Sequence, residues 1–270
     1  MSGMSRAGAI VSVVAVCALA GCGGDSAENR VSPENRVEVE GNEYAFSMPD
    51  QIEGGVVTLA VSNSGKQLHE YVIARLAPGK TPQGLLAFLR ENPDGGPPEW
   101  VTFVGGVPLL SPGREIAVTR ELEPATYVML CFQQAPDGKP HVEHGMVKSF
   151  EVEGESDAEP PKADATVTSI ERGFEAIPEV EAGRRTLELR NDASEPRDFL
   201  FGVLEPGTTL ADLDRWFMQG MQGRAPFTFL GGVGDVRPGT SAYLTAELEA
   251  GTTYTLIDTE THAHADLAPR

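Results

Sequence analysis

The chain has 270 residues, of which 40 are acidic and 21 basic, and its formal net charge is −19 at pH 7. A surface this acidic repels the phosphates of nucleic acids and of anionic lipid headgroups, which excludes nucleic-acid binding as a leading function. Glycine and proline are plentiful, aromatic residues are few and long helical patterns are nearly absent, so the composition predicts an all-β protein with room for two domains.

The first 21 residues have the organisation of a secretory signal peptide. One basic residue, Arg6, precedes an apolar run from Ala9 to Ala20 that is too short to span a membrane. The run ends in Leu19-Ala20-Gly21-Cys22, which resembles the lipobox of bacterial lipoproteins. This resemblance implies cleavage before Cys22, acylation of its sulfur, and a mature protein anchored on the extracytoplasmic face of the cell membrane. The alternative is a plain secretory signal in which Cys22 is incidental.

Residues 22–36 are polar and aperiodic, which predicts a flexible tether. From Val37 onward, short alternating or β-branched runs predict a first domain of strands over residues 37–153. One short helix is expected from Pro82 to Leu89, with Thr81 as its N-cap. Residues 154–165 are acidic, rich in proline and free of aromatic side chains, so they are expected to be a linker.

Beyond the linker the pattern of the first domain returns. Thr186-Leu-Glu-Leu-Arg-Asn191 matches Thr58-Leu-Ala-Val-Ser-Asn63, and Phe227-Thr-Phe-Leu-Gly-Gly232 matches Val101-Thr-Phe-Val-Gly-Gly106. A second short helix is expected over residues 210–218. The repeat predicts two copies of one β-sandwich, the second over residues 166–270. The Gly-Gly pairs at 105–106 and 231–232 follow strands and open no helix, which predicts turns of the sheet.

The most distinctive chemistry lies between Tyr127 and Met146. This stretch holds Cys131, His141, His144 and Met146. If Cys22 carries lipid, Cys131 has no disulfide partner in an oxidising compartment, which favours a metal ligand over a spare thiol. A thiolate, two imidazoles and a thioether are the ligand set of a blue-copper, or type 1, site.

These residues stand in an order that resembles the cupredoxin fold. In the first copy, Asn63-Ser-Gly65 is followed by His69, then by Tyr127 and Cys131. His141 and Met146 come last, with the spacing of the final histidine and methionine in plastocyanin-like members. The resemblance covers most of residues 37–153 and, without ligands, residues 164–265. It implies two tandem eight-stranded Greek-key sandwiches, each with one short inserted helix. It also implies a single copper ion, held by His69, Cys131, His141 and Met146.

One feature departs from the family. Nine residues separate Cys131 from His141, whereas cupredoxins usually have a much shorter loop. The turn residues at 136–138 allow the imidazole to return toward the cysteine. The long loop leaves His144 as a competing ligand.

The second copy differs where the first has its candidate ligands. His69 aligns with Arg197 and Cys131 with Asp258, and no methionine follows Asp258. The chain ends too soon for a full equivalent of the last strand. His262 and His264 form an H-x-H pair near the end, and on an extended tail they are expected to be solvated rather than to ligate a metal. Any metal is therefore expected in the first copy.

The sequence favours a membrane-anchored, extracytoplasmic copper protein that transfers electrons to a redox partner or handles copper, with no small-molecule substrate. Zinc also accepts cysteine and histidine ligands. The alternative is a metal-free tandem sandwich that serves as an interaction or accessory protein, because the second copy keeps the pattern without the ligands and Cys131 can be a buried hydrophobe. A copper enzyme of the multicopper oxidase or nitrite reductase kind is not expected. Such enzymes need a second copper centre built from several more histidines, often beside the cysteine, whereas this chain has only five histidines and Cys131 is flanked by Leu130 and Phe132.

Overall fold

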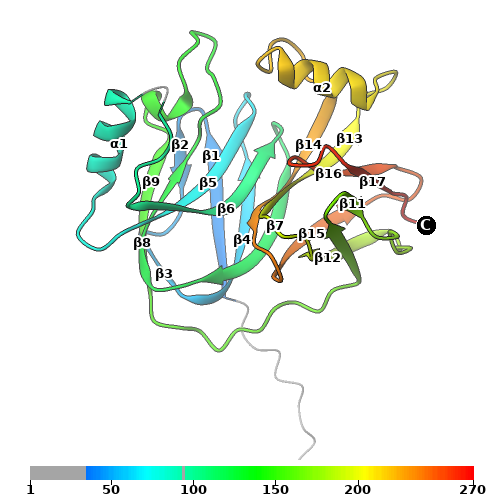
Figure 1. Cartoon of the computed structure of the whole chain (residues 1–270), viewed down its shortest axis with the longest axis horizontal. Coiled ribbons are helices and arrows are strands. Elements are labelled where there is room, and N and C mark those ends of the chain that lie inside the picture. Colours follow the sequence, from blue (N-terminus) through cyan, green and yellow to red (C-terminus); the bar gives the residue numbers. More distant parts are fainter. Residues whose placement is uncertain (1–34, 93–94) are drawn as a thin grey trace, which may run out of the picture. The chain divides into compact units, whose positions relative to one another are not determined.

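The computed structural model describes residues 35–92 and 95–270, so the leader, Cys22 and nearly all of the expected tether lie outside the described residues. The described elements are mostly β-strands, together with two short α-helices, one in each copy (Figure 1). This confirms the all-β class and the tandem sandwiches with one helix each. Neither helix is long and apolar enough to cross a membrane.

The first copy is built from two sheets. One sheet has the order β2-β1-β4-β7 and the other has the order β6-β5-β8-β9-β3. It has one strand more than the eight expected, because the short β3 pairs in parallel with β9 at the sheet edge. The strands are β1 (Arg36–Asn42), β2 (Ala45–Ser47), β3 (Gln51–Glu53), β4 (Gly55–Asn63), β5 (His69–Leu76), β6 (Val101–Leu110), β7 (Glu115–Leu122), β8 (Ala125–Leu130) and β9 (Val147–Glu153).

The second copy repeats this arrangement, with sheets ordered β11-β10-β12-β15 and β17-β16-β13-β14. The end of the chain forms β17, a shortened equivalent of the last strand of the first copy, because β17 pairs with β16 as β9 pairs with β8. His262 and His264 are both exposed, as expected. Alternation explains the strand: Ala265 and Leu267 are buried while His264 is exposed. The strands are β10 (Ala165–Ile170), β11 (Gly173–Phe174), β12 (Gly183–Asn191), β13 (Arg197–Leu204), β14 (Phe227–Val236), β15 (Ser241–Leu248), β16 (Tyr254–Asp258) and β17 (His264–Leu267).

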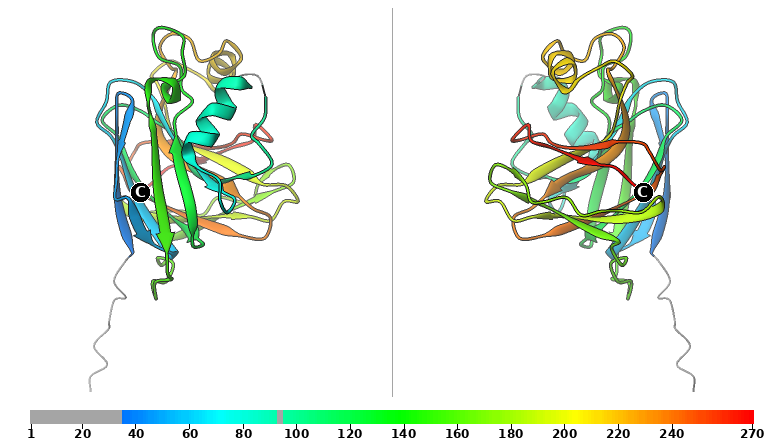
Figure 2. Two further views of the ribbon diagram at one scale, coloured as in Figure 1. Left: turned by 90° about the vertical axis from the view of Figure 1, so that its left-hand side faces the viewer. Right: turned by 90° about the vertical axis from the view of Figure 1, so that its right-hand side faces the viewer.

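Each helix covers the outer face of one sheet. Figure 2 shows α1 (Pro82–Glu91) lying over the sheet that contains β5 and β8. The hydroxyl of Thr81 caps its first turn, and Leu85 packs on outward-facing residues of β5 and β8. In α2 (Leu210–Met218) a capping box forms at the N-terminus, and the buried Trp216 packs on β13 and β14. The caps satisfy main-chain N–H groups that have no partner inside a helix.

The two copies share a hydrogen-bonded scaffold. The side-chain amide of Asn63 donates two bonds of 2.8 Å, to the carbonyl four residues later and to the last carbonyl of β6. Asn191 donates the same two bonds, to the carbonyl four residues later and to the last carbonyl of β14. Both amides are buried, and each fixes the turn that leads into the next strand. This turn places His69 and Arg197 at equivalent positions.

The two copies are joined through their edge strands. β6 pairs with β14 and β7 pairs with β15, both antiparallel, so each sheet continues from one copy into the other. Val118 faces Leu244, and the flanking pairs are Ala117 with Thr245 and Thr119 with Tyr243. Val118 and Leu244 are equivalent residues, each the fourth of its strand, and the flanking pairs also correspond when the two copies are exchanged. The register is therefore that of an interface with two-fold symmetry. Pairing removes four exposed strand edges that isolated sandwiches would present to solvent.

The expected turns at the two Gly-Gly pairs are wrong. Both pairs lie inside long strands, β6 and β14, at irregularities in the strand register. Gly106 and Gly232 have φ of 114° and 145°, and a Cβ on either would lie within 2 Å of the main-chain oxygen of Tyr71 or Phe199. Glycine is required there because the neighbouring strand approaches too closely for any side chain.

Candidate metal centre

Cys131 follows the last residue of β8, a strand with a buried end that carries the cysteine into the interior. Its side chain has 0% exposure. The main-chain N–H of Glu70 donates to its sulfur across 3.3 Å. His69 begins β5, the neighbour of β8, and is also fully buried. Strand pairing therefore brings these two side chains together across 62 positions of sequence.

The nine-residue loop between Cys131 and His141 folds back on itself as a small hairpin. Gln134 pairs with Pro140 in an antiparallel bridge, and the main-chain N–H of His141 donates to the carbonyl of Gln133 at 2.8 Å. A 3-10 helix, η1 (His141–His144), follows directly. The loop thus returns the imidazole of His141 to the cysteine despite its length.

Three donor atoms converge in the interior of the first copy. The Sγ atom of Cys131 lies 3.3 Å from Nδ1 of His141 and 3.9 Å from Nδ1 of His69, and the two Nδ1 atoms are 3.2 Å apart. A point in the plane of this triangle lies about 2.0 Å from every corner, close to the bond lengths by which imidazole and thiolate hold a metal ion. In the part of the chain that the structure describes, this is the one group of histidine, cysteine and carboxylate side chains compact enough to hold a metal.

Burial controls the protonation of the three groups. It lowers the pKa of His69 to about 4, with a smaller contribution in the same direction from nearby His141. It also lowers the pKa of His141, and it raises the pKa of the Cys131 thiol to about 12. At neutral pH without metal, the cluster therefore consists of two neutral imidazoles and a thiol, with lone pairs that a cation can use.

No protein-family model matches the chain, and no curated protein matches it significantly. Among solved structures, auracyanin from Roseiflexus castenholzii is 22% identical, with 44% of this chain and 98% of auracyanin covered and a TM-score of 0.32. Auracyanin A of Chloroflexus aurantiacus, a blue copper protein, is 20% identical over 44% and 98% of the two chains, with a TM-score of 0.30. A copper nitrite reductase from Nitrosomonas europaea is 12% identical over 87% and 93%, with a TM-score of 0.26.

The strands of the chain themselves define its fold. Two sandwiches of one topology follow each other, and in the first a histidine opens β5 and a cysteine follows β8. The chain has a tandem cupredoxin-like fold.

Met146 and His144 take different positions relative to the cluster. Met146 is fully buried, its N–H donates to the carbonyl of His141, and its carbonyl accepts from the N–H of Cys131. Its main chain thus joins Cys131 and His141, the two candidate ligands of the loop. His144 lies outside the group of three, with Nε2 3.1 Å from a carboxylate oxygen of Asp137 and its ring stacked on Tyr44.

Three residues around the cluster had no signal in the sequence. Glu70 donates its N–H to the cysteine sulfur, and its carboxylate accepts from the N–H of Phe132 and the amide of Gln133. Burial raises the pKa of Glu70. Gln67 and Tyr44 contact His141. Polar residues beside strand ends are ordinary in any sequence, and strand pairing alone decides which of them face the sulfur or the imidazole.

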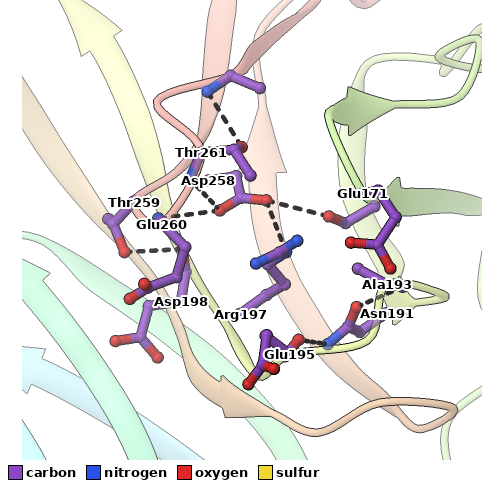
Figure 3. A network of polar contacts seen from close by, with 12 residues as sticks. Glu171, Asn191, Ala193, Glu195, Arg197, Asp198, Asp258, Thr259, Glu260 and Thr261 are labelled. Carbon is purple, nitrogen blue, oxygen red and sulfur yellow. Dashed lines mark hydrogen bonds and ion pairs between the residues drawn. The ribbon is translucent and has the colours of Figure 1, made fainter.

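The second cupredoxin-like copy has an ion pair between Arg197 and Asp258 at the position equivalent to the cluster of the first copy. Figure 3 shows this pair and its polar neighbours. Nε of Arg197 lies 3.2 Å from Oδ2 of Asp258, with side-chain exposures of 5% and 0%. The same carboxylate accepts from the hydroxyl of Ser169 and from the N–H groups of Glu260 and Thr261. The sequence alignment of Arg197 with His69 and of Asp258 with Cys131 therefore holds in space, and opposite charges fill the equivalent position.

Proposed function

We propose that the protein binds one copper ion in its first copy as a type 1 site and serves in electron transfer or copper handling. His69, Cys131 and His141 would hold the ion, with Met146 as a weak axial ligand. The observation that carries this proposal is the triangle of Nδ1, Nδ1 and Sγ atoms with sides of 3.2, 3.3 and 3.9 Å.

The donor types favour copper over zinc. Structural zinc sites complete a tetrahedron with further cysteine, histidine or carboxylate ligands. No other side chain of these types joins the group among the described residues, and the buried neighbour joined to it by main-chain bonds is a methionine. Thiolate and thioether ligands are soft donors that suit copper, and a bound copper ion would supply one-electron chemistry.

Burial of the three donors favours electron transfer over catalysis. Each of the three side chains has 0% exposure, so the site offers a substrate no open face. An electron needs no open face, because it can transfer between the metal and a docked partner through a thin layer of protein. We therefore propose a redox carrier without a small-molecule substrate of its own.

The membrane location is part of the same proposal. The lipobox-like Leu19 to Cys22 sequence supports acylation at Cys22 and an extracytoplasmic position, with the polar residues 23–34 as a spacer. The net charge of −19 supports a redox partner with a basic surface. Metabolic labelling with a radioactive fatty acid would test the anchor: label is expected in the protein and absent from Cys22→Ala, and equal labelling of both would contradict it.

An optical spectrum of the purified full-length protein after Cu(II) addition and dialysis tests the metal site. We expect an intense copper–thiolate band in the visible that is lost in Cys131→Ala. The matched pair His141→Ala and His144→Ala separates the two loop histidines: the first should abolish the band and the second should keep it. Wild-type protein that retains no copper would overturn the proposal and leave the metal-free tandem scaffold, an interaction or accessory protein.

A further inference from the structure

A second layer of side chains covers the outer edge of His141. Oε1 of Gln67 lies 3.2 Å from Nε2 of His141, and the amide nitrogen of Gln67 donates to the hydroxyl of Tyr44 at 3.2 Å. The ring of Tyr44 meets the ring of His141 edge-on, with centroids 5.0 Å apart. On its other side Tyr44 stacks on His144, at 4.5 Å. Tyr44 and Gln67 therefore stand between the buried imidazole and solvent.

The main chain holds Tyr44 in an unusual conformation. Its φ is 68°, in the left-handed region that bulky residues rarely adopt. The carboxylate of the preceding residue, Glu43, accepts from the N–H groups of Lys66 and Gln67, which ties the Tyr44 turn to the Gln67 segment. Such strain is kept where surrounding structure or function requires it.

The second copy shows which of these features the fold itself requires. It retains the glutamate, because Glu171 accepts from the N–H of Ser194 at 2.8 Å as Glu43 does from its own turn. At the positions of Tyr44 and Gln67 it has Arg172 and Glu195. The tyrosine and the glutamine are thus absent from the copy that lacks His69, Cys131 and His141. The two-residue connection between the first two strands and the glutamate contact are nevertheless present in both copies.

The contact of Gln67 with His141 has a chemical consequence. A neutral imidazole carries one proton, on Nδ1 or on Nε2. With Oε1 of Gln67 as the acceptor, the proton is held on Nε2, which leaves the lone pair of Nδ1 directed at Cys131 and His69. A partner on the second ring nitrogen sets the tautomer and ring orientation of a metal-binding histidine.

We propose that Gln67 and Tyr44 are positioning residues of the metal centre. Gln67 holds His141 in the tautomer that presents Nδ1 to the metal, and Tyr44 closes the site against solvent and small reagents. The inference rests on the proposed copper site for its purpose, and both contacts can be tested by measurement in the metal-free protein.

Nitrogen-15 NMR of the histidine side chains in the metal-free, full-length protein tests the role of Gln67. We expect the Nε2–H tautomer of His141 in the wild type and in Gln67→Glu, which keeps an acceptor. Gln67→Leu should lose it, and Glu195→Leu at the equivalent position of the second copy should leave it unchanged. An Nδ1–H tautomer in the wild type, or no difference between the two leucine variants, would overturn the assignment.

The reaction of Cys131 with a small thiol reagent tests the role of Tyr44 in the same metal-free protein. Removing the cover in Tyr44→Ala should speed the reaction roughly tenfold, while Tyr44→Phe and the second-copy control Arg172→Ala should react like the wild type. Equal rates for Tyr44→Ala and Arg172→Ala would contradict a closing role.

Copper affinity then links both residues to the proposed function. Loss of an outer partner of this kind typically lowers metal affinity about 10- to 100-fold, which is the decrease expected for Gln67→Leu relative to Glu195→Leu. If the wild type binds no copper, the proposed function fails, whereas the tautomer and the thiol reaction still decide whether Gln67 and Tyr44 position His141.

Discussion

Nδ1 of His141 lies 3.3 Å from Sγ of Cys131 although nine residues separate the two in sequence. The intervening segment forms a hairpin, closed by the bond from the N–H of His141 to the carbonyl of Gln133. A further bond from the N–H of Val142 to the carbonyl of Cys131 fixes the same approach. A long loop with its own internal pairing thus brings the two side chains into contact.

The stability of the metal-free protein should fall in mild acid because of His69. Burial lowers its pKa from 6.5 to about 4, so between these values the unfolded chain binds a proton that the folded chain does not. The free energy of unfolding should therefore rise with pH by roughly 3 kcal/mol from pH 4 to 6.5 and level off above it. The lowered pKa of His141 acts in the same direction.

Urea unfolding across this pH range, compared between wild type and His69→Gln, measures the contribution. The variant should lose that part of the pH dependence, whereas His264→Gln, which removes an exposed histidine of β17, serves as the control. Identical slopes for wild type and His69→Gln would contradict the prediction.

Copper binding should release about one proton per ion near neutral pH. The imidazoles of the cluster are already neutral there, but the Cys131 thiol, with a pKa of about 12, must lose its proton to become a thiolate ligand. Calorimetric titration in buffers of different ionisation enthalpy gives the number of protons. Cys131→Ala should release none on any residual binding, and release of two protons by the wild type would show that a histidine is protonated before the metal arrives.

The buried ion pair of the second copy should be essential for stability. Asp258→Ala leaves the guanidinium of Arg197 buried without its partner and should lower the free energy of unfolding by about 3–5 kcal/mol. The exposed pair of Arg190 and Asp192 is the control, because Asp192→Ala removes a surface contact and should have little effect. Denaturant unfolding measures both, and similar losses would show that burial does not set the strength of the pair.

The mid-strand glycines should tolerate no side chain. A Cβ at Gly106 would lie 1.8 Å from the main-chain oxygen of Tyr71, so Gly106→Ala should lower the free energy of unfolding by about 3 kcal/mol or more. Gly79 also has a positive φ, 77°, but nothing lies within 4 Å of its would-be Cβ, so Gly79→Ala should lose only about 1 kcal/mol. Equal losses would mean that φ alone, without the clash, accounts for the requirement.

Much of the fold was predictable because its signals are local. Alternating residues predicted most of the strands, and the predicted cap Thr81 lies where the first helix begins. The exceptions were the glycine pairs and the final strand. Whether a glycine pair turns the chain or bulges within a strand depends on the neighbouring strand, and β17 is a strand because β16 offers it an edge.

The candidate site was predictable in its residue types and less so in its surroundings. Histidine, cysteine and methionine in family order pointed to one site in the first copy. Tyr44, Gln67 and Glu70 are common polar or aromatic residues, and nothing in their sequence neighbourhood marks a contact with the cluster.

By itself, the sequence determined the all-β class, the internal repeat, the short helices and the set of soft donors. Each of these depends only on residue type and on spacing over a short range of sequence. Only the tertiary structure decided that His69 and His141, 72 positions apart, place their Nδ1 atoms within 3.2 Å, and that the two copies share both sheets. The physical reason is the same for both. Distances between residues that are remote in sequence depend on which strand edges pair and in which register. That pairing is determined by packing over the whole chain and not by any local segment.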